Sequence, residues 1–191
     1  MGKIIVFTNV TLDGVMQAPG RPDEDPREGF EHGGWATPYG AMQEAGETIA
    51  NMGALLLGRW TYESFYAFWP NQTDTPFTAL LNNIQKYVVS TILEEPLAWS
   101  NATLLRGAVS QTVGRLKEVQ DQDIVVFGSA VLTQSLMQHN LVDEYVLLIH
   151  PVVIGKGKRL FANEGTYAAL RLNATKTTTT GVVIATYQTA L

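Results

Sequence analysis

Three small residues, Gly128-Ser129-Ala130, follow a short apolar run and form the part of the chain best suited to hold an anion. The run, Ile124–Phe127, is rich in β-branched residues and predicts a strand buried on both faces. Val131, Leu132 and Leu136 then recur at helical spacing, which predicts a helix that starts near Ser129. A strand, a glycine turn and a helix N-terminus direct free backbone N–H groups and the helix dipole at one point. The alternative is a tight turn that binds nothing, because one glycine turn is a weak motif.

A second predicted strand-to-helix turn carries a cation. Gly58-Arg59-Trp60-Thr61 follows the apolar run Ala54–Leu57 and precedes a predicted helix. An arginine at such a turn can hold a phosphate by its charge and by its fork of donors. Thr61 can add a hydroxyl group or cap the helix. The competing interpretation is a surface arginine beside a helix cap.

Small polar side chains also end two further predicted strands. Thr8 and Asn9 lie at the end of Lys3–Val10, and Ser90-Thr91 ends the strand Lys86–Ser90. In open α/β sheets, ligands lie beyond the carboxyl ends of the strands. The recurrence of such residues at four strand ends therefore predicts a single cleft at one edge of a sheet.

The elements that must position these residues alternate between strands and helices along the chain. Beyond those already named, we predict helices over Pro38–Met52, Phe77–Ile84 and Val109–Val119, strands over Ala98–Leu105 and Tyr145–Ile149, and a C-terminal hairpin over about 167–177 and 182–189. Gly53 is expected to end the first of these helices, and Ser110 to cap the third. The order predicts one α/β domain over residues 1–191, with three α/β/α layers and a mixed, mostly parallel sheet that ends in an antiparallel hairpin.

A long irregular segment separates the first predicted strand from the first helix. It is rich in proline and glycine, ends in Gly33-Gly34-Trp35, and carries acids at Asp23, Glu24, Asp25, Glu28 and Glu31. A loop of this length inside a compact domain is usually a lid or a substrate wall. The glycine-tryptophan end favours an ordered contact, and a variable surface loop is the alternative.

Composition excludes several classes of function. The net charge of −5 argues against non-specific nucleic-acid binding. The lack of cysteine excludes disulfides and cysteine-ligated metals, and it fits a cytoplasmic protein. No apolar run approaches the ~20 residues of a membrane span. His32, His139 and His150 are neither spaced nor framed by carboxylates as metal ligands, so we expect no metal site and no catalytic histidine.

The motifs together resemble the dihydrofolate reductase-like superfamily. More narrowly, they resemble stand-alone bacterial proteins similar to the C-terminal reductase domain of the riboflavin-biosynthesis deaminase/reductase. The matching pieces span nearly the whole chain in the expected order: TLDG at Thr11–Gly14, LLLGRWTYES at Leu55–Ser64, KYVVS at Lys86–Ser90, VVFGSAVLTQSL at Val125–Leu136 and LVDEYVLLIHPVVIGKGKRLF at Leu141–Phe161.

The resemblance implies a dihydrofolate reductase-like fold and NADPH as the cofactor. The turn at Arg59 and Thr61 would face the 2′-phosphate and pyrophosphate groups, the turn at Gly128 would wrap the pyrophosphate, and Ser90 would lie on the adenosine side. The residues implied to bind the cofactor are Thr8, Asn9, Met16, Gln17, Gly58, Arg59, Trp60, Thr61, Ser90, Thr91, Phe127, Gly128, Ser129, Ala130, Val131 and Leu132. Thr8, Asn9, Met16 and Gln17 would lie near the nicotinamide.

The substrate side departs from the dihydrofolate reductases. Those enzymes carry a carboxylate on the helix after the long loop, and the position that aligns here is near Met42, with Glu44 and Glu47 close by. Folate is therefore not expected as the substrate. Asp13 is the acid nearest the predicted cleft and is our candidate proton donor, although Asp before Gly is also ordinary turn chemistry.

Aromatic residues are available to wall a flat heterocycle. Trp35, Tyr62 and Phe65 are the candidates, and each could instead belong to the core, as we expect for Trp69. We therefore expect an NADPH-dependent reductase that transfers a hydride to a small, flat, conjugated substrate, pterin-like or similar to a riboflavin precursor. The alternative is a non-catalytic NADP-binding or dimeric scaffold that retains the fold. A homodimer is expected, since Tyr145–Ile154 and the C-terminal hairpin supply apolar strands that need covering.

Overall fold

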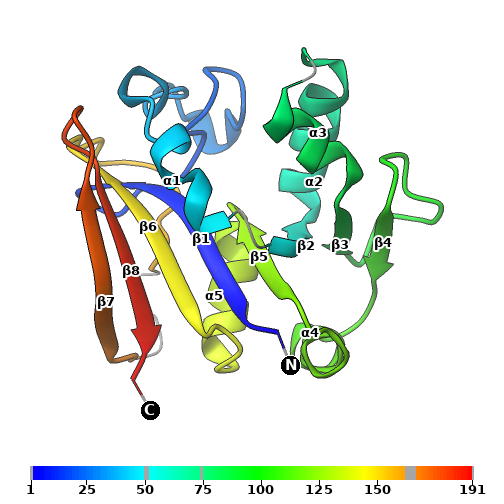
Figure 1. Ribbon diagram of the computed structural model, residues 1–191. Helices are drawn as coiled ribbons and strands as arrows, with labels where there is room; N and C mark the ends of the chain where they lie inside the picture. The colour runs from blue at the N-terminus through cyan, green and yellow to red at the C-terminus, as the bar shows by residue number, and fades with distance from the viewer. Residues whose placement is uncertain (1, 50–51, 74, 162–166, 191) are drawn as a thin grey trace.

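The computed structural model describes residues 2–49, 52–73, 75–161 and 167–190 (Figure 1). Among these residues, eight strands form one sheet in the order β4-β3-β2-β5-β1-β6-β8-β7. The strands are β1 Ile4–Thr11, β2 Met52–Gly58, β3 Gln85–Val89, β4 Ala102–Leu105, β5 Asp123–Phe127, β6 Glu144–His150, β7 Leu170–Thr177 and β8 Val183–Thr189. The helices are α1 Met42–Ile49, α2 Arg59–Phe68, α3 Pro76–Asn83, α4 Val109–Val119 and α5 Ala130–Gln138.

The sheet is mixed, and most of its strands are parallel. Strands β4, β3, β2, β5, β1 and β6 run in one direction, β8 pairs antiparallel with β6, and β7 pairs antiparallel with β8. This arrangement confirms the predicted parallel sheet with an antiparallel C-terminal hairpin. Within the described ranges, no helix has both the length and the apolar character needed to cross a bilayer.

Alternate residues of the central strands serve two separate cores. Ile5 and Phe7 of β1 face a core that includes side chains from α1, α2 and α3. Ile4 and Val6 face the opposite core, which includes side chains from α4 and α5. Because both faces are covered, the strands read as unbroken apolar runs, and the predicted three-layer α/β/α architecture is confirmed.

Some predicted boundaries were wrong. The first helix begins at Met42 and not at Pro38, because Gly40 adopts a left-handed φ of 59° after a short 3-10 turn. Gly53 lies inside β2 and does not end a helix. Residue Ala108, not Ser110, occupies the cap position of α4. The edge strand β4 is shorter than predicted, and residues 50–51 of the predicted helix lie outside the described residues.

The long segment before α1 is ordered around a small core of its own. Val15, Ala18, Phe30, Trp35 and Ala36 pack together. The indole Nε1 of Trp35 donates a hydrogen bond of 2.8 Å to the carbonyl oxygen of residue 17. The expected ordered contact at the glycine-tryptophan end is therefore confirmed.

Gln17 connects this segment to the basic turn after β6. Its side-chain Nε2 donates to the carbonyl oxygens of Asp25 and Arg27, both at 3.1 Å, and its Oε1 accepts from the backbone N–H of Lys158 at 2.9 Å. Gly157 permits the close approach, since a Cβ atom there would lie 2.7 Å from the ring of Phe30. The loop is thereby fixed against the carboxyl edge of the sheet.

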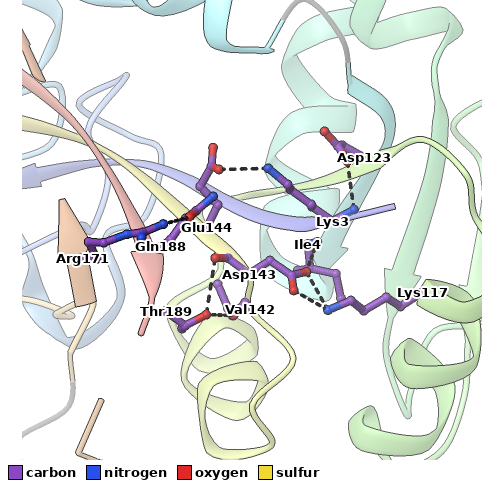
Figure 2. Close-up of polar contacts among 10 residues, drawn as sticks. All are labelled: Lys3, Ile4, Lys117, Asp123, Val142, Asp143, Glu144, Arg171, Gln188 and Thr189. Carbon is purple, nitrogen blue, oxygen red and sulfur yellow. Dashed lines mark hydrogen bonds and ion pairs between the residues drawn. The ribbon is translucent and has the colours of Figure 1, made fainter. Parts of the chain in front are cut away.

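The opposite, amino edge of the sheet is braced by charged side chains (Figure 2). Asp143 accepts a hydrogen bond of 2.8 Å from the backbone N–H of Ile4 and pairs with Lys117 at 2.6 Å. The backbone N–H of Lys3 donates to Asp123 at 2.9 Å. These contacts join β1, β5, β6 and α4 at the edge away from the predicted ligand site.

Candidate active site

A cavity of about 880 Å³ opens at the carboxyl edge of the central strands. The ends of β1, β2 and β5, the starts of α2 and α5, and the long segment before α1 all contribute to its lining. It brings together these predicted site residues: Thr8, Asn9, Met16, Gln17, Gly58, Arg59, Trp60, Thr61, Phe65, Phe127, Gly128, Ser129, Ala130, Val131 and Leu132.

One hydroxyl group joins the two strand-to-helix turns directly. Ser129 has a left-handed φ of 58°, and its Oγ accepts a hydrogen bond of 2.9 Å from the backbone N–H of Gly58. The same Oγ lies 2.7 Å from Oγ1 of Thr61. A Cβ atom at Gly58 would lie 3.1 Å from this oxygen, so glycine allows the two turns to approach. The starts of α2 and α5 are therefore held side by side.

The N-termini of three helices at the cavity have no side-chain cap in the described part of the chain. The cap positions are Gly58 for α2, Ala108 for α4 and Ser129 for α5. The first residue of each of these helices lines the cavity. In α3, by contrast, Oγ1 of Thr75 accepts from the backbone N–H of Thr78. Uncapped N–H groups and helix dipoles make a helix N-terminus a binding site for anions such as phosphate.

Arg59 adds a cation to this part of the cavity. Its Nη1 donates to both carboxylate oxygens of Glu63, at 3.0 and 3.2 Å. Both side chains are 39% exposed, so the pair is weak and a phosphate group can replace Glu63 as the partner.

Apolar side chains also line the cavity. They belong to Met16, Met42, Phe65, Phe68, Trp69, Phe77 and Leu81. Trp69, expected in the core, packs against the core and also lines the cavity, with its ring 6.2 Å from that of Phe65. Apolar walls of this kind suit a flat, conjugated ligand.

The long segment reaches across to α2 through two cation–π contacts. The guanidinium of Arg27 lies 4.0 Å from the ring centroid of Trp60 and is paired with Asp25 at 2.5 Å. The guanidinium of Arg21 lies 4.3 Å from the ring centroid of Phe68. All five residues line the cavity, so this segment forms one of its walls.

Glu24 is an acid at the cavity that the sequence did not single out. One of its oxygens accepts from the backbone N–H groups of Gly20 and Arg21, at 2.6 and 3.1 Å. Burial raises the pKa of the Glu24 carboxyl above its usual value. The five acids of this segment look alike in sequence, and only the fold separates them, by burial and by ion pairing.

The structure corrects the expectation for Asp13, which does not line the cavity. Its carboxylate accepts from the hydroxyl of Thr11 at 2.6 Å and from the backbone N–H groups of Ile154 and Gly155 at 3.2 and 2.8 Å. These bonds, the Thr11 hydroxyl foremost, lower the pKa of Asp13 to about 2. Asp13 therefore holds a turn together, and its lowered pKa argues against a role as proton donor.

Four other predicted residues do not line the cavity. Tyr62 is buried, and its hydroxyl accepts from the backbone N–H of Trp99 at 3.0 Å. Trp35 belongs to the small core of the long segment. Ser90 turns its hydroxyl to the backbone of the loop that follows it, and Thr91 is exposed. Other parts of the chain thus engage the side chains of Tyr62, Trp35 and Ser90, and the side chain of Thr91 is exposed to solvent.

No described acid of α1 lines the cavity. Met42 does so, and Glu44 pairs with Lys176 at 3.7 Å. The side chain of Glu47 lies outside the described residues. Met42 thus gives this part of the cavity an apolar surface.

His150 is a further cavity residue that sequence reasoning set aside. Its Nε2 lies 2.8 Å from Oδ1 of Asn9, and burial lowers its pKa to about 4. The alternation of side chains along a strand could have indicated this position. His150 lies two residues after Leu148 and four after Val146, so all three side chains lie on the same face of β6.

The chain belongs to the RibD C-terminal domain family, because the sequence model of this family matches residues 2–184. It is 28% identical over 193 residues to the uncharacterized protein YyaP of Bacillus subtilis, with 97% of this chain and 94% of YyaP aligned. Family membership confirms the resemblance drawn from the motifs, and it supports a reductase-type function.

Two solved structures show the same fold. A pyrimidine reductase-like protein from Corynebacterium diphtheriae has a TM-score of 0.69 at 11% identity, over 100% of this chain and 92% of that chain. Dihydrofolate reductase from Enterococcus faecalis, complexed with NADP(H), has a TM-score of 0.62 at 13% identity, over 98% of this chain and 96% of that chain. The fold is therefore dihydrofolate reductase-like, as predicted.

Proposed function

We propose that this protein is an NADPH-dependent reductase that transfers a hydride to a small, flat, conjugated substrate. The observation that carries the proposal is one cavity that combines two kinds of lining. Three uncapped helix N-termini and Arg59 supply groups that bind anions, and other residues supply apolar side chains. The first kind suits the phosphates of a dinucleotide, and the second suits the two flat rings between which a hydride passes.

The residues present fit NADPH. Gly128 lines the cavity with a left-handed φ of 58°, and without a side chain its backbone can come close to a phosphate group. The free N–H groups at the start of α5 would bind the pyrophosphate, and Arg59 would bind the 2′-phosphate. When bound, the cofactor supplies the hydride.

Reduction also needs a proton, and Glu24 is the group we propose to supply it. Its carboxyl group lines the cavity and has a raised pKa, so it retains its proton to higher pH than an exposed glutamate does. Asp25, the neighbouring acid of the cavity, is paired with Arg27 and has a lowered pKa.

Titrating the protein with NADPH and with NADH, followed by nicotinamide fluorescence, tests the cofactor. NADPH should bind more tightly, and Arg59→Ala should weaken NADPH far more than NADH. Arg106→Ala, which removes an arginine outside the cavity, is the matched control. No binding of either nucleotide, or an equal loss for both in Arg59→Ala, refutes the proposed site.

Turnover tests the reaction. NADPH oxidation should be measured with pterins, flavin precursors and quinones as substrates. Glu24→Gln should lower kcat and leave NADPH affinity unchanged, whereas Glu31→Gln, at an exposed acid of the same segment, should change neither. Unchanged kcat in Glu24→Gln would remove this residue from the mechanism.

The second candidate function is a non-catalytic NADP-binding scaffold. It is favoured by the position of Asp13 outside the cavity and by the apolar Met42 on α1. Tight NADPH binding with no oxidation by any of these substrates would support it.

We also propose a cytoplasmic homodimer. Most of β7 is exposed, including Leu172, and this strand pairs on one side only within the described sheet. An exposed edge strand is a ready template for pairing with a second chain. Light scattering coupled to size exclusion should give twice the mass of the chain, and a monomer at all concentrations would refute the dimer.

A further inference from the structure

His150 is a buried polar side chain that faces the cavity with one of its two ring nitrogens unpaired. The residue is 1% exposed. Nε2 lies 2.8 Å from Oδ1 of Asn9, while Nδ1 is buried and has no hydrogen-bond partner among the described residues. The rings of Trp35 and Tyr39 make T-shaped contacts with the imidazole, with centroid distances of 5.2 and 5.3 Å. Asn9, Trp35 and Tyr39 are all uncharged in these contacts.

These contacts determine which nitrogen carries the proton. The imidazole is neutral, because it is buried without an acid beside it. With the proton on Nε2, this nitrogen donates to Oδ1 of Asn9, and Nδ1 remains a bare acceptor. With the proton on Nδ1, a buried N–H has no acceptor, and orphaned buried donors are rarer than under-satisfied acceptors. The Nε2–H form is therefore favoured.

The tautomer in turn orients the amide group of Asn9. Oδ1 is engaged by His150, so Nδ2 points away from the ring. Asn9 is half-buried and lines the cavity, and its Nδ2 makes no hydrogen bond within the described part of the chain. A side-chain amide with one end fixed presents its two N–H donors in a defined direction.

We propose that His150 is a positioning residue that holds Oδ1 of Asn9, so that Nδ2 donates a hydrogen bond to a carbonyl oxygen on a ring bound in the cavity. The identity of that ring rests on the proposed function. The oxygen belongs either to the substrate or to the carboxamide of the nicotinamide, and the chemistry recognised is the same. The inference gives the bound ligand a specific feature: a flat ring bearing a carbonyl group at its edge.

The tautomer is tested in the ligand-free protein, independently of any activity. Long-range proton–nitrogen NMR on ¹⁵N-labelled protein near neutral pH should show His150 with a protonated Nε2 and a bare Nδ1. The signals are assigned by their loss in His150→Gln. A proton on Nδ1 overturns the proposal, even if the protein proves to be a reductase. If the wild type does not bind NADPH, the proposed function is wrong. The NMR measurement still decides which nitrogen of His150 carries the proton.

Binding measurements test the donor. Asn9→Asp keeps an acceptor for His150 and replaces the N–H donors by oxygen. His150→Leu releases the Asn9 amide, whereas His150→Gln can still donate to it. His139→Gln, at an exposed histidine, is the control. Circular dichroism and melting confirm that each variant is folded.

We expect Asn9→Asp and His150→Leu to weaken one ligand by roughly three- to tenfold, the loss expected for one neutral hydrogen bond. His150→Gln should recover most of that loss. A rise in the Kd of NADPH places the acceptor on the nicotinamide, and a rise in the substrate KM alone places it on the substrate. If folded Asn9→Asp changes neither, the proposal is wrong, and this arm holds even if His150→Leu fails to fold.

Discussion

Replacing His150 by glutamine should remove a pH-dependent component of stability between about pH 7 and about pH 5. Burial lowers the pKa of His150 from 6.5 to about 4, and the residue is 1% exposed, so solvent screening is negligible. Between these two pKa values the unfolded chain binds a proton that the folded protein does not. The stability contributed by the neutral histidine is thus complete above pH 6.5 and is lost as the pH falls toward 4. The loss is about 2 kcal/mol at pH 5 and about 3 kcal/mol below pH 4.

Urea denaturation of the wild type and of His150→Gln at several pH values measures this component. Other groups also contribute to the pH dependence of stability: the raised pKa of Glu24 acts with the opposite sign, and the lowered pKa values of Asp13 and Asp25 act at lower pH. Both proteins contain these groups, so their contributions cancel in the difference. The free-energy gap between the two proteins should shift by about 2 kcal/mol between pH 7 and pH 5, in the direction that favours the variant in acid. A gap that stays constant within about 0.5 kcal/mol would refute a buried neutral His150.

Three further predictions concern the turns and the amino edge of the sheet. Glu63→Gln should free the guanidinium of Arg59 and tighten NADPH by about two- to fivefold at low salt, with no change for NADH, as measured by fluorescence titration. Gly128→Ala should cost about 1 kcal/mol in urea denaturation, because a residue with a φ of 58° is strained when it carries a Cβ atom, and it should also weaken NADPH. Asp143→Asn should lower the free energy of unfolding by about 1–3 kcal/mol through loss of the Lys117 pair, with no effect on cofactor affinity; a loss of NADPH binding would contradict the separation of the two edges.

The fold could be predicted because its signals are local. The apolar run at Ile4–Phe7 indicates a strand covered on both faces, and the turns at Gly58 and Gly128 mark the points where strands give way to helices. Since parallel strands present their carboxyl ends at one edge, the convergence of these turns on one cavity followed from topology.

The errors concern polar side chains that other groups of the protein engage, some distant in sequence and some close. Asp13 has the same local pattern as a site residue, but the backbone of residues 154 and 155 engages its carboxylate. Ser90 likewise ends a strand, yet its hydroxyl bonds to the following loop. His150 was set aside although its place on β6 aims it at the same face as Leu148. The periodicity of apolar residues can assign such a residue to one face of a strand, but it does not show which groups will form hydrogen bonds with its polar atoms.

The hydroxyl of Ser129 has a consequence for how ligands are told apart. Because it bonds to both Gly58 and Thr61, it acts as a spacer that sets the distance between two positively polarised helix ends. A ligand with two phosphate groups at the matching separation would engage both ends at once, and a ligand with a single phosphate group would reach only one. Discrimination by phosphate spacing would then depend on the Ser129 hydroxyl and the two helix ends, and it would survive many changes among the other side chains.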